Sequence, residues 1–344
     1  MAVLSKRDRL QALMAGEPAD RPPVTVWHHF LEEETDAEAF VKATADFQAA
    51  YDWDLIKINP RAVCFTETWG NRYDYSEYIG YGPKCIEHIL NNPRDLEKIT
   101  YQSIEGTPLG EQVEIVKKLR ELAGEDVPIV QTIYSPLAVI LNLTGTRMIG
   151  RYRPAPREDS PVVKYIREEP VLLKRALSAM ADTMADYVKA LLNAGADGLF
   201  YTPLGLAREG YLTQEERETY LKAYDLRILE AAEGAFTILH TCGIHAHPEF
   251  FSSYPIHVLH WAENAPGNPS LQSAPLWLGK KAVMGGVDER LFHQGPEGLS
   301  AVKRAAQKAV RSHNRQPFFL APECSVAPET TPEEYFALRE AVEL

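Results

Sequence analysis

Short runs of apolar and β-branched residues recur along the chain, and amphipathic stretches separate them. Each run is nearly continuous rather than alternating, which is typical of parallel strands covered on both faces. The alternation of such runs with amphipathic stretches predicts repeated βα units around a parallel sheet. The eight predicted strands are residues 23–27, 55–59, 127–133, 198–202, 236–240, 257–261, 282–286 and 317–321.

Eight strands of this kind predict an α/β protein with the (β/α)8 architecture, the TIM barrel. The chain has 344 residues, whereas ~250 are typical of this architecture. We therefore expect an N-terminal extension and an insertion after the second strand. Because no internal repeat and no linker divide the sequence, residues 1–344 are predicted to form a single barrel domain.

Two of the intervening helices have clear boundaries. Ser5 can cap a first helix that ends at Gly16, and Pro170 begins a long helix that ends at Gly195. Helical spacing predicts that one face of the long helix is buried. The apolar residues on that face are Leu173, Leu177, Met180, Met184, Tyr187 and Leu191.

The segment 61–110 gives the weakest signal. Four tyrosines, Tyr73, Tyr75, Tyr78 and Tyr81, lie there among glycines and charged residues. The sequence is compatible both with a small hairpin and with a cover over an active site, and it does not decide between them.

Composition narrows the class of protein. No apolar run approaches the roughly 20 residues that cross a bilayer, and the charged N-terminus lacks the apolar region of a signal peptide. We therefore expect a soluble cytoplasmic protein. The formal net charge of -12 opposes binding to nucleic acid or to an anionic membrane surface. Four cysteines are too few for a disulfide framework, and in a reducing cytosol clustered thiols favour metal binding or catalysis.

In a TIM barrel the active site lies at the C-terminal ends of the strands, so the polar residues that end each run are the candidates. They are His28, His29, Asn59, Arg61, Gln131, Tyr134, Tyr201, Thr202, His240, Cys242, His260, Glu263, Asp288, Glu323 and Cys324.

The strongest combination among them is His240 and Cys242 after the fifth strand with Cys324 after the eighth. Residues i and i+2 of an extended segment face the same side, so the imidazole and the first thiol can converge. One nitrogen and two sulfurs suit Zn2+, and three protein ligands leave a position open for substrate. The alternative is that both cysteines are small buried hydrophobes and His240 is a core histidine bonded to a carbonyl.

Five further residues are candidate catalytic groups. Lys57 should point the same way as Asn59, and inside a barrel its ammonium needs a carboxylate partner or a substrate anion. Only one of the neighbours His28 and His29 can face the barrel axis, and we take His28 as the candidate. Glu263 and Asp288 are the remaining two, although polar residues in such turns often cap the next helix.

The remaining cysteines and two loop histidines carry less weight. Cys64 and Cys85 have no histidine at ligand spacing and are expected to be structural or incidental. His245 and His247 follow the predicted metal motif, where they could donate hydrogen bonds to the ligands or serve as a fourth ligand, but solvated loop residues are the commoner case.

On these residues the chain resembles the uroporphyrinogen decarboxylase superfamily and, within it, the cobamide-dependent methyltransferases. The resemblance covers nearly the whole chain. It includes Arg7-Asp-Arg-Leu10, Gly16-Glu-Pro-Ala-Asp20-Arg-Pro-Pro23, Ala194-Gly-Ala-Asp197, His240-Thr-Cys-Gly243, Gly285-Gly-Val-Asp288 and Cys324-Ser-Val-Ala-Pro328-Glu-Thr-Thr-Pro332.

The resemblance implies a zinc-dependent methyltransferase whose metal ligands match His240, Cys242 and Cys324. Such enzymes move a methyl group between a small substrate or thiol and a corrinoid, which a separate partner protein usually carries. The alternative is a decarboxylase of tetrapyrrole biosynthesis. That group carries arginines just after the first strand, whereas residues 25–30 here contain none. A third possibility is a barrel that binds a ligand or metal without turnover.

Overall fold

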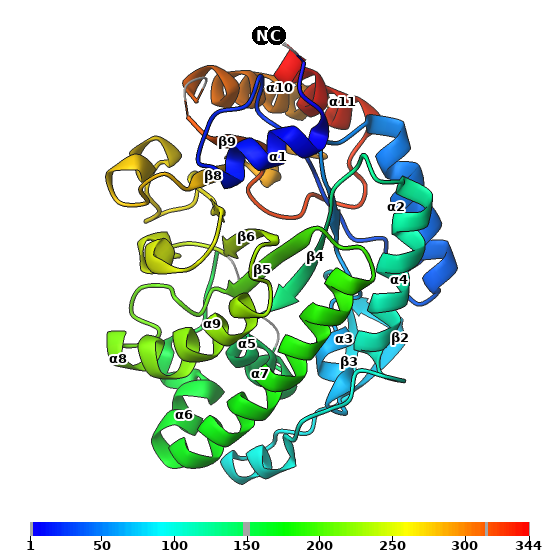
Figure 1. The fold of residues 1–344 in the computed structure, drawn as a ribbon. Coiled ribbons are helices and arrows are strands. Elements are labelled where there is room, and N and C mark those ends of the chain that lie inside the picture. Colours follow the sequence, from blue (N-terminus) through cyan, green and yellow to red (C-terminus); the bar gives the residue numbers. More distant parts are fainter. Residues whose placement is uncertain (1–2, 147–151, 314–315, 344) are drawn as a thin grey trace.

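A curled parallel sheet of seven strands forms the centre of the computed structural model, which describes residues 3–146, 152–313 and 316–343. The strand order is β1-β4-β5-β6-β7-β8-β9, so each strand of the sheet pairs with the next along the chain. Figure 1 shows helices around the outside of this sheet. The strands are β1 (Ile56–Ile58), β4 (Ile129–Tyr134), β5 (Gly198–Leu204), β6 (Phe236–Thr241), β7 (Val258–His260), β8 (Ala282–Val287) and β9 (Phe318–Pro322).

The first of the eight predicted strands is not a strand in the described structure, and this prediction is corrected. Residues 23–27 contain a single parallel bridge, from Val24 to Leu320 of β9. Backbone hydrogen bonds nevertheless join this segment to its two neighbours in the sheet. Thr25 N–H donates to Leu320 O of β9, and Asp54 N–H, from the residues before β1, donates to Val24 O. The segment thus lies between β9 and the residues that lead into β1.

Helices follow most strands. The α-helices are α1 (Lys6–Met14), α2 (Ala37–Tyr51), α3 (Cys64–Thr68), α4 (Pro108–Ala123), α5 (Pro136–Leu143), α6 (Pro161–Glu168), α7 (Pro170–Asn193), α8 (Gln214–Glu216), α9 (Ala223–Glu230), α10 (Gly295–Ser312) and α11 (Pro332–Glu340). Short 3-10 turns and a π-helical turn at Arg217–Lys222 complete the elements. No described helix combines the length and the apolar character that a membrane span requires.

Both helix predictions are confirmed. Ser5 caps α1 by accepting a hydrogen bond from Asp8 N–H at 3.1 Å, and Gly16 follows the helix with a positive φ of 70°. In α7 all six residues of the predicted apolar face are buried. The long helix is therefore buried through the face that its sequence indicates.

Apolar side chains fill the interior of the curled sheet. They come from alternate positions of the strands, such as Phe236 and Ile238 of β6, and from Leu10 and Leu13 of α1. Because side chains of a strand alternate between its two faces, the next inward position on β6 is His240. The interior is thus a packed core, and polar inward residues begin only near the strands' C-terminal ends.

The tyrosine-rich segment forms an antiparallel hairpin of β2 (Arg72–Ile79) and β3 (Gly82–Glu87). Figure 1 shows it beside α3, on the side to which the strands of the main sheet point. Its tyrosines bind the body of the protein: the Tyr75 hydroxyl donates to Glu67 at 2.5 Å and the Tyr78 hydroxyl to Glu34 at 2.7 Å. The hairpin is therefore attached at several points.

Asp225 of α9 is a buried carboxylate that sequence analysis did not select. Its side chain accepts hydrogen bonds from Ser135 Oγ at 2.7 Å, Tyr201 Oη at 2.5 Å and Tyr254 Oη at 3.1 Å. Burial raises its pKa to about 6, and the three hydroxyls partly oppose this shift. The cluster ties α9 to β5 and to the loop after β4.

This cluster predicts a pH-dependent contribution to stability. Because the folded-state pKa of Asp225 exceeds its usual 3.8, its stabilising effect is complete below about pH 4 and is lost as pH rises through about 6. Relative to Asp225→Asn, the free energy of unfolding of the wild type should fall by roughly 3 kcal/mol over that range. Denaturant unfolding at a series of pH values measures the difference. A constant difference between the two proteins would contradict the assignment.

Candidate metal centre

A cavity of about 410 Å³ opens at the C-terminal ends of the strands. The strand ends supply its floor, and the hairpin and α5 supply part of its wall. Its polar and aromatic lining includes Trp27, His29, Lys57, Asn59, Thr66, Tyr73, Tyr81, Cys85, Thr132, Tyr134, Asn142, Phe200, Thr202, His240, Cys242, Cys324 and Ser325. The cavity therefore contains the three predicted metal ligands.

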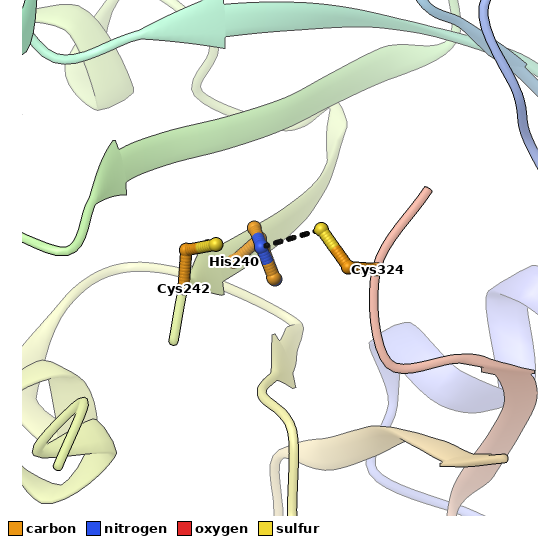
Figure 2. Close-up of side chains that lie close together, drawn as sticks. All are labelled: His240, Cys242 and Cys324. Carbon is orange, nitrogen blue, oxygen red and sulfur yellow. Dashed lines mark hydrogen bonds between the residues drawn. The ribbon is translucent and has the colours of Figure 1, made fainter. Parts of the chain in front are cut away.

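His240, Cys242 and Cys324 converge in this cavity, as the spacing predicts. His240 lies on β6, Cys242 follows that strand, and Cys324 follows β9. Figure 2 shows both thiols pointing toward the His240 ring, one from each side. The Cys324 Sγ lies 3.9 Å from His240 Nε2. All three side chains are buried, with exposed fractions of 5%, 5% and 9%.

The donor atoms fit a zinc ion. All three lie within 4.8 Å of one another. Tetrahedral zinc at its usual bond lengths separates a nitrogen and a sulfur ligand by about 3.6 Å, close to the 3.9 Å between His240 and Cys324. The alternative of a core histidine bonded to a carbonyl is not what the structure shows, since His240 Nδ1 is buried without a hydrogen-bond partner.

Lys57 is buried in the wall of the same cavity, with an exposed fraction of 7%. Its ammonium lies 4.7 Å from the Trp27 ring centre and 4.4 Å from that of Phe200, and it donates to Asn59 Oδ1 at 3.1 Å. Within the described residues it has no carboxylate partner. Burial lowers its pKa to about 7, and Cys324 opposes the shift.

The two neighbouring histidines after the first predicted strand exchange the roles expected of them. His29 lines the cavity and stacks on Tyr81 with ring centres 5.0 Å apart. His28 packs away from the cavity, 4.3 Å from the Phe30 ring and 5.1 Å from that of Phe47. Without a regular strand over residues 25–29, alternation could not identify which of the two faces inward.

Glu263 and Asp288 do not line the cavity. Glu263 accepts hydrogen bonds from Leu271 N–H and Ser270 Oγ, so it orders the loop after β7. Asp288 caps the turn after β8 through Arg290 N–H and pairs with the Arg290 guanidinium at 2.6 Å. Both carboxylates therefore bind neighbouring turns outside the cavity.

Several cavity residues were not selected from the sequence. Cys85, for which the sequence predicts a structural or incidental position, lies in the cavity wall on β3, and Tyr73 and Tyr81 come from the same hairpin. Thr132 and Phe200 also line the cavity. Each lies two residues before a candidate, Tyr134 and Thr202, and therefore on the same face of its strand. The inward alternation of β4 and β5 could have identified Thr132 and Phe200, but no local pattern places the hairpin over the strand ends.

The chain belongs to the uroporphyrinogen decarboxylase (URO-D) family, whose model matches residues 5–344. Among the relatives, the methylcobamide:CoM methyltransferases MtbA of Methanosarcina mazei and Methanosarcina acetivorans are each 21% identical to it in an alignment of 258 residues that covers 71% of this chain and 71% of the relative. The chain is thus related to methyltransferases within a family named for a decarboxylase.

Solved structures support the fold. A methyltransferase from Methanosarcina mazei superposes with a TM-score of 0.77 at 20% identity, covering 99% of this chain and 98% of that one. A B12-independent methionine synthase from Shewanella sp. W3-18-1 superposes with a TM-score of 0.52 at 13% identity, covering 95% and 93%. The curled sheet is therefore an arrangement shared with these barrel-like proteins.

Proposed function

We propose that this protein is a zinc-dependent methyltransferase that moves a methyl group between a small substrate or thiol and a corrinoid carried by a partner protein. The observation that carries the proposal is the convergence of His240, Cys242 and Cys324 at the floor of the cavity. The relationship to methylcobamide:CoM methyltransferases supports methyl transfer as the type of reaction.

The three ligands define what the metal would contribute. When bound, zinc supplies Lewis acidity that lowers the pKa of a coordinated thiol, so that a thiolate is available at neutral pH. Three protein ligands leave one position for a substrate atom. All three ligand side chains are buried, and electrostatic contacts are stronger in such a setting than in bulk water.

Lys57 supports a further part of the proposal, the class of substrate. Among the described residues that line the cavity, it is the only lysine or arginine, and no aspartate or glutamate is present. A buried ammonium without a carboxylate partner is costly, and a negatively charged substrate would offset that cost. Asn59 holds the ammonium in place through its side-chain oxygen. We therefore propose an anionic group on the substrate next to Lys57.

We propose that a corrinoid protein would approach the cavity over the hairpin. The hairpin lies on the strand-end side of the molecule, and Ile79 at its tip is 60% exposed while also lining the cavity. A methyl group on cobalt has to come within about 3 to 3.5 Å of its acceptor. The partner would therefore cover the rim formed by the hairpin and by the loops after β6 and β9.

Metal analysis tests the proposed centre. The purified protein should carry about one zinc per chain, because one imidazole and two thiolates form a high-affinity site. Cys242→Ser and Cys324→Ser should each lower the zinc content strongly. Cys64→Ser, which alters a buried cysteine away from the metal ligands, is the matched control. Unchanged zinc in folded Cys242→Ser or Cys324→Ser protein would refute the ligand set.

The decarboxylase alternative predicts that the protein acts on uroporphyrinogen, whereas the methyltransferase proposal does not. Uroporphyrinogen carries several carboxylates, and arginines pair with such groups most strongly. No arginine is found among the described residues that line the cavity. We therefore expect no coproporphyrinogen from uroporphyrinogen, measured by chromatography of the oxidised porphyrins. Robust turnover by the pure protein would favour the decarboxylase.

A further inference from the structure

His260 of β7 is completely buried beside the proposed metal ligands, with an exposed fraction of 0%. Its ring centre lies 4.6 Å from that of His240, with the two planes inclined at 34°. Trp27 meets it edge-on at 5.5 Å and Phe200 lies at 5.8 Å. The imidazole is thus enclosed by aromatic rings, one of which belongs to a proposed ligand.

The other end of this imidazole contacts a different strand. His260 Nε2 lies 3.1 Å from the carbonyl oxygen of Pro322, the last residue of β9. A carbonyl oxygen can only accept, so the Nε2 atom carries the proton and donates it. Cys324 follows Pro322 by two residues, so this hydrogen bond holds the chain directly before the second thiol ligand.

These two contacts span the gap between the ligands. His240 is on β6 and Cys324 follows β9, and β7 and β8 lie between those strands in the sheet. His260 pairs in register with His240 on the neighbouring strand. One side chain therefore touches the imidazole ligand with its ring face and fixes the segment of the thiolate ligand with its N–H.

We propose that His260 is a positioning residue that holds His240 and Cys324 at the spacing a metal ion requires. The proposal rests on the metal centre proposed above. An apolar side chain would be sufficient if His260 served packing alone. In the described structure, the Nδ1 atoms of both His240 and His260 are buried without a hydrogen-bond partner. Such unpaired polar atoms are destabilising, so their presence next to the ligands favours a role in the site.

Three variants separate positioning from general stability. His260→Phe keeps a ring of similar size but removes the donor to Pro322. His260→Gln can place an amide N–H near the position of Nε2 and should restore that contact. His313→Phe is the matched control, because His313 is also buried and its Nδ1 also bonds a backbone carbonyl, that of Ala309 at 2.9 Å, at the opposite end of β9.

Two readouts are compared on folded protein: zinc affinity, by competition with a chromophoric chelator, and the visible spectrum of the Co2+-substituted protein, which reports ligand geometry. We expect His260→Phe to bind zinc about 10- to 100-fold more weakly, as loss of a supporting contact around a metal typically does, and to shift the cobalt bands. His260→Gln should lie within a few-fold of wild type, and His313→Phe should match wild type in both readouts, whatever its stability.

Wild-type zinc affinity and an unchanged cobalt spectrum in His260→Phe would overturn the proposal. So would an equal loss in His260→Phe and His260→Gln, because the hydrogen bond would then be irrelevant. If the phenylalanine variant does not fold, His260→Asn, whose shorter amide does not reach Pro322, replaces it in the comparison with His260→Gln. Absence of zinc from the wild type would instead refute the metal centre itself.

Discussion

His240→Ala should lower the rate of methyl transfer from methylcobalamin to a thiol by at least about 1000-fold, to the rate observed without protein. The substitution removes the only nitrogen of the proposed ligand set and leaves two thiols on different strands without a common partner. Since the metal is what would lower the pKa of the substrate thiol, no other residue of the cavity can replace its contribution.

Demethylation of free methylcobalamin, followed by absorbance with a panel of thiols, measures this effect. His313→Ala is the control, because it truncates another buried histidine outside the cavity. Binding of a corrinoid protein should be nearly unchanged in His240→Ala, since His240 lies on the cavity floor and docking would involve the rim. Equal rates for wild type and His240→Ala would remove the metal from the mechanism.

Lys57→Met should raise KM for an anionic thiol by about 10- to 100-fold, the typical cost of losing a charge-assisted contact in a buried site. The unbranched methionine side chain fits between the rings of Trp27 and Phe200 but carries no charge. The free energy of unfolding should not fall, because the ammonium that is removed has no carboxylate partner among the described residues.

A pair of similar thiols tests this prediction within one protein. With 3-mercaptopropionate the KM should rise strongly in Lys57→Met, whereas with neutral 2-mercaptoethanol it should change by no more than about 3-fold. The zinc content should stay at the wild-type value. An equal rise in KM for both thiols would show that Lys57 does not recognise the substrate's charge.

Local sequence patterns determined much of the architecture. The apolar face of α7 follows from helical periodicity, and the capping of α1 follows from the hydroxyl of Ser5. Seven of the eight predicted strands follow from continuous apolar runs, because parallel strands covered on both faces bury successive residues. The alternation of side chains in an extended segment placed His240 and Cys242 on one side of a strand end. The predicted barrel joined Cys324, at the end of the eighth strand, to them, although 84 residues separate it from His240.

Only the tertiary structure decided which groups share the cavity. It placed His29 instead of His28 at the site, because residues 23–27 form a bridge rather than an alternating strand. It brought Cys85 and the hairpin tyrosines over the strand ends, gathered three hydroxyls around Asp225, and set His260 between two ligand-bearing strands. These are contacts between distant segments, and their geometry depends on how the sheet curls, which no short-range spacing of residues encodes.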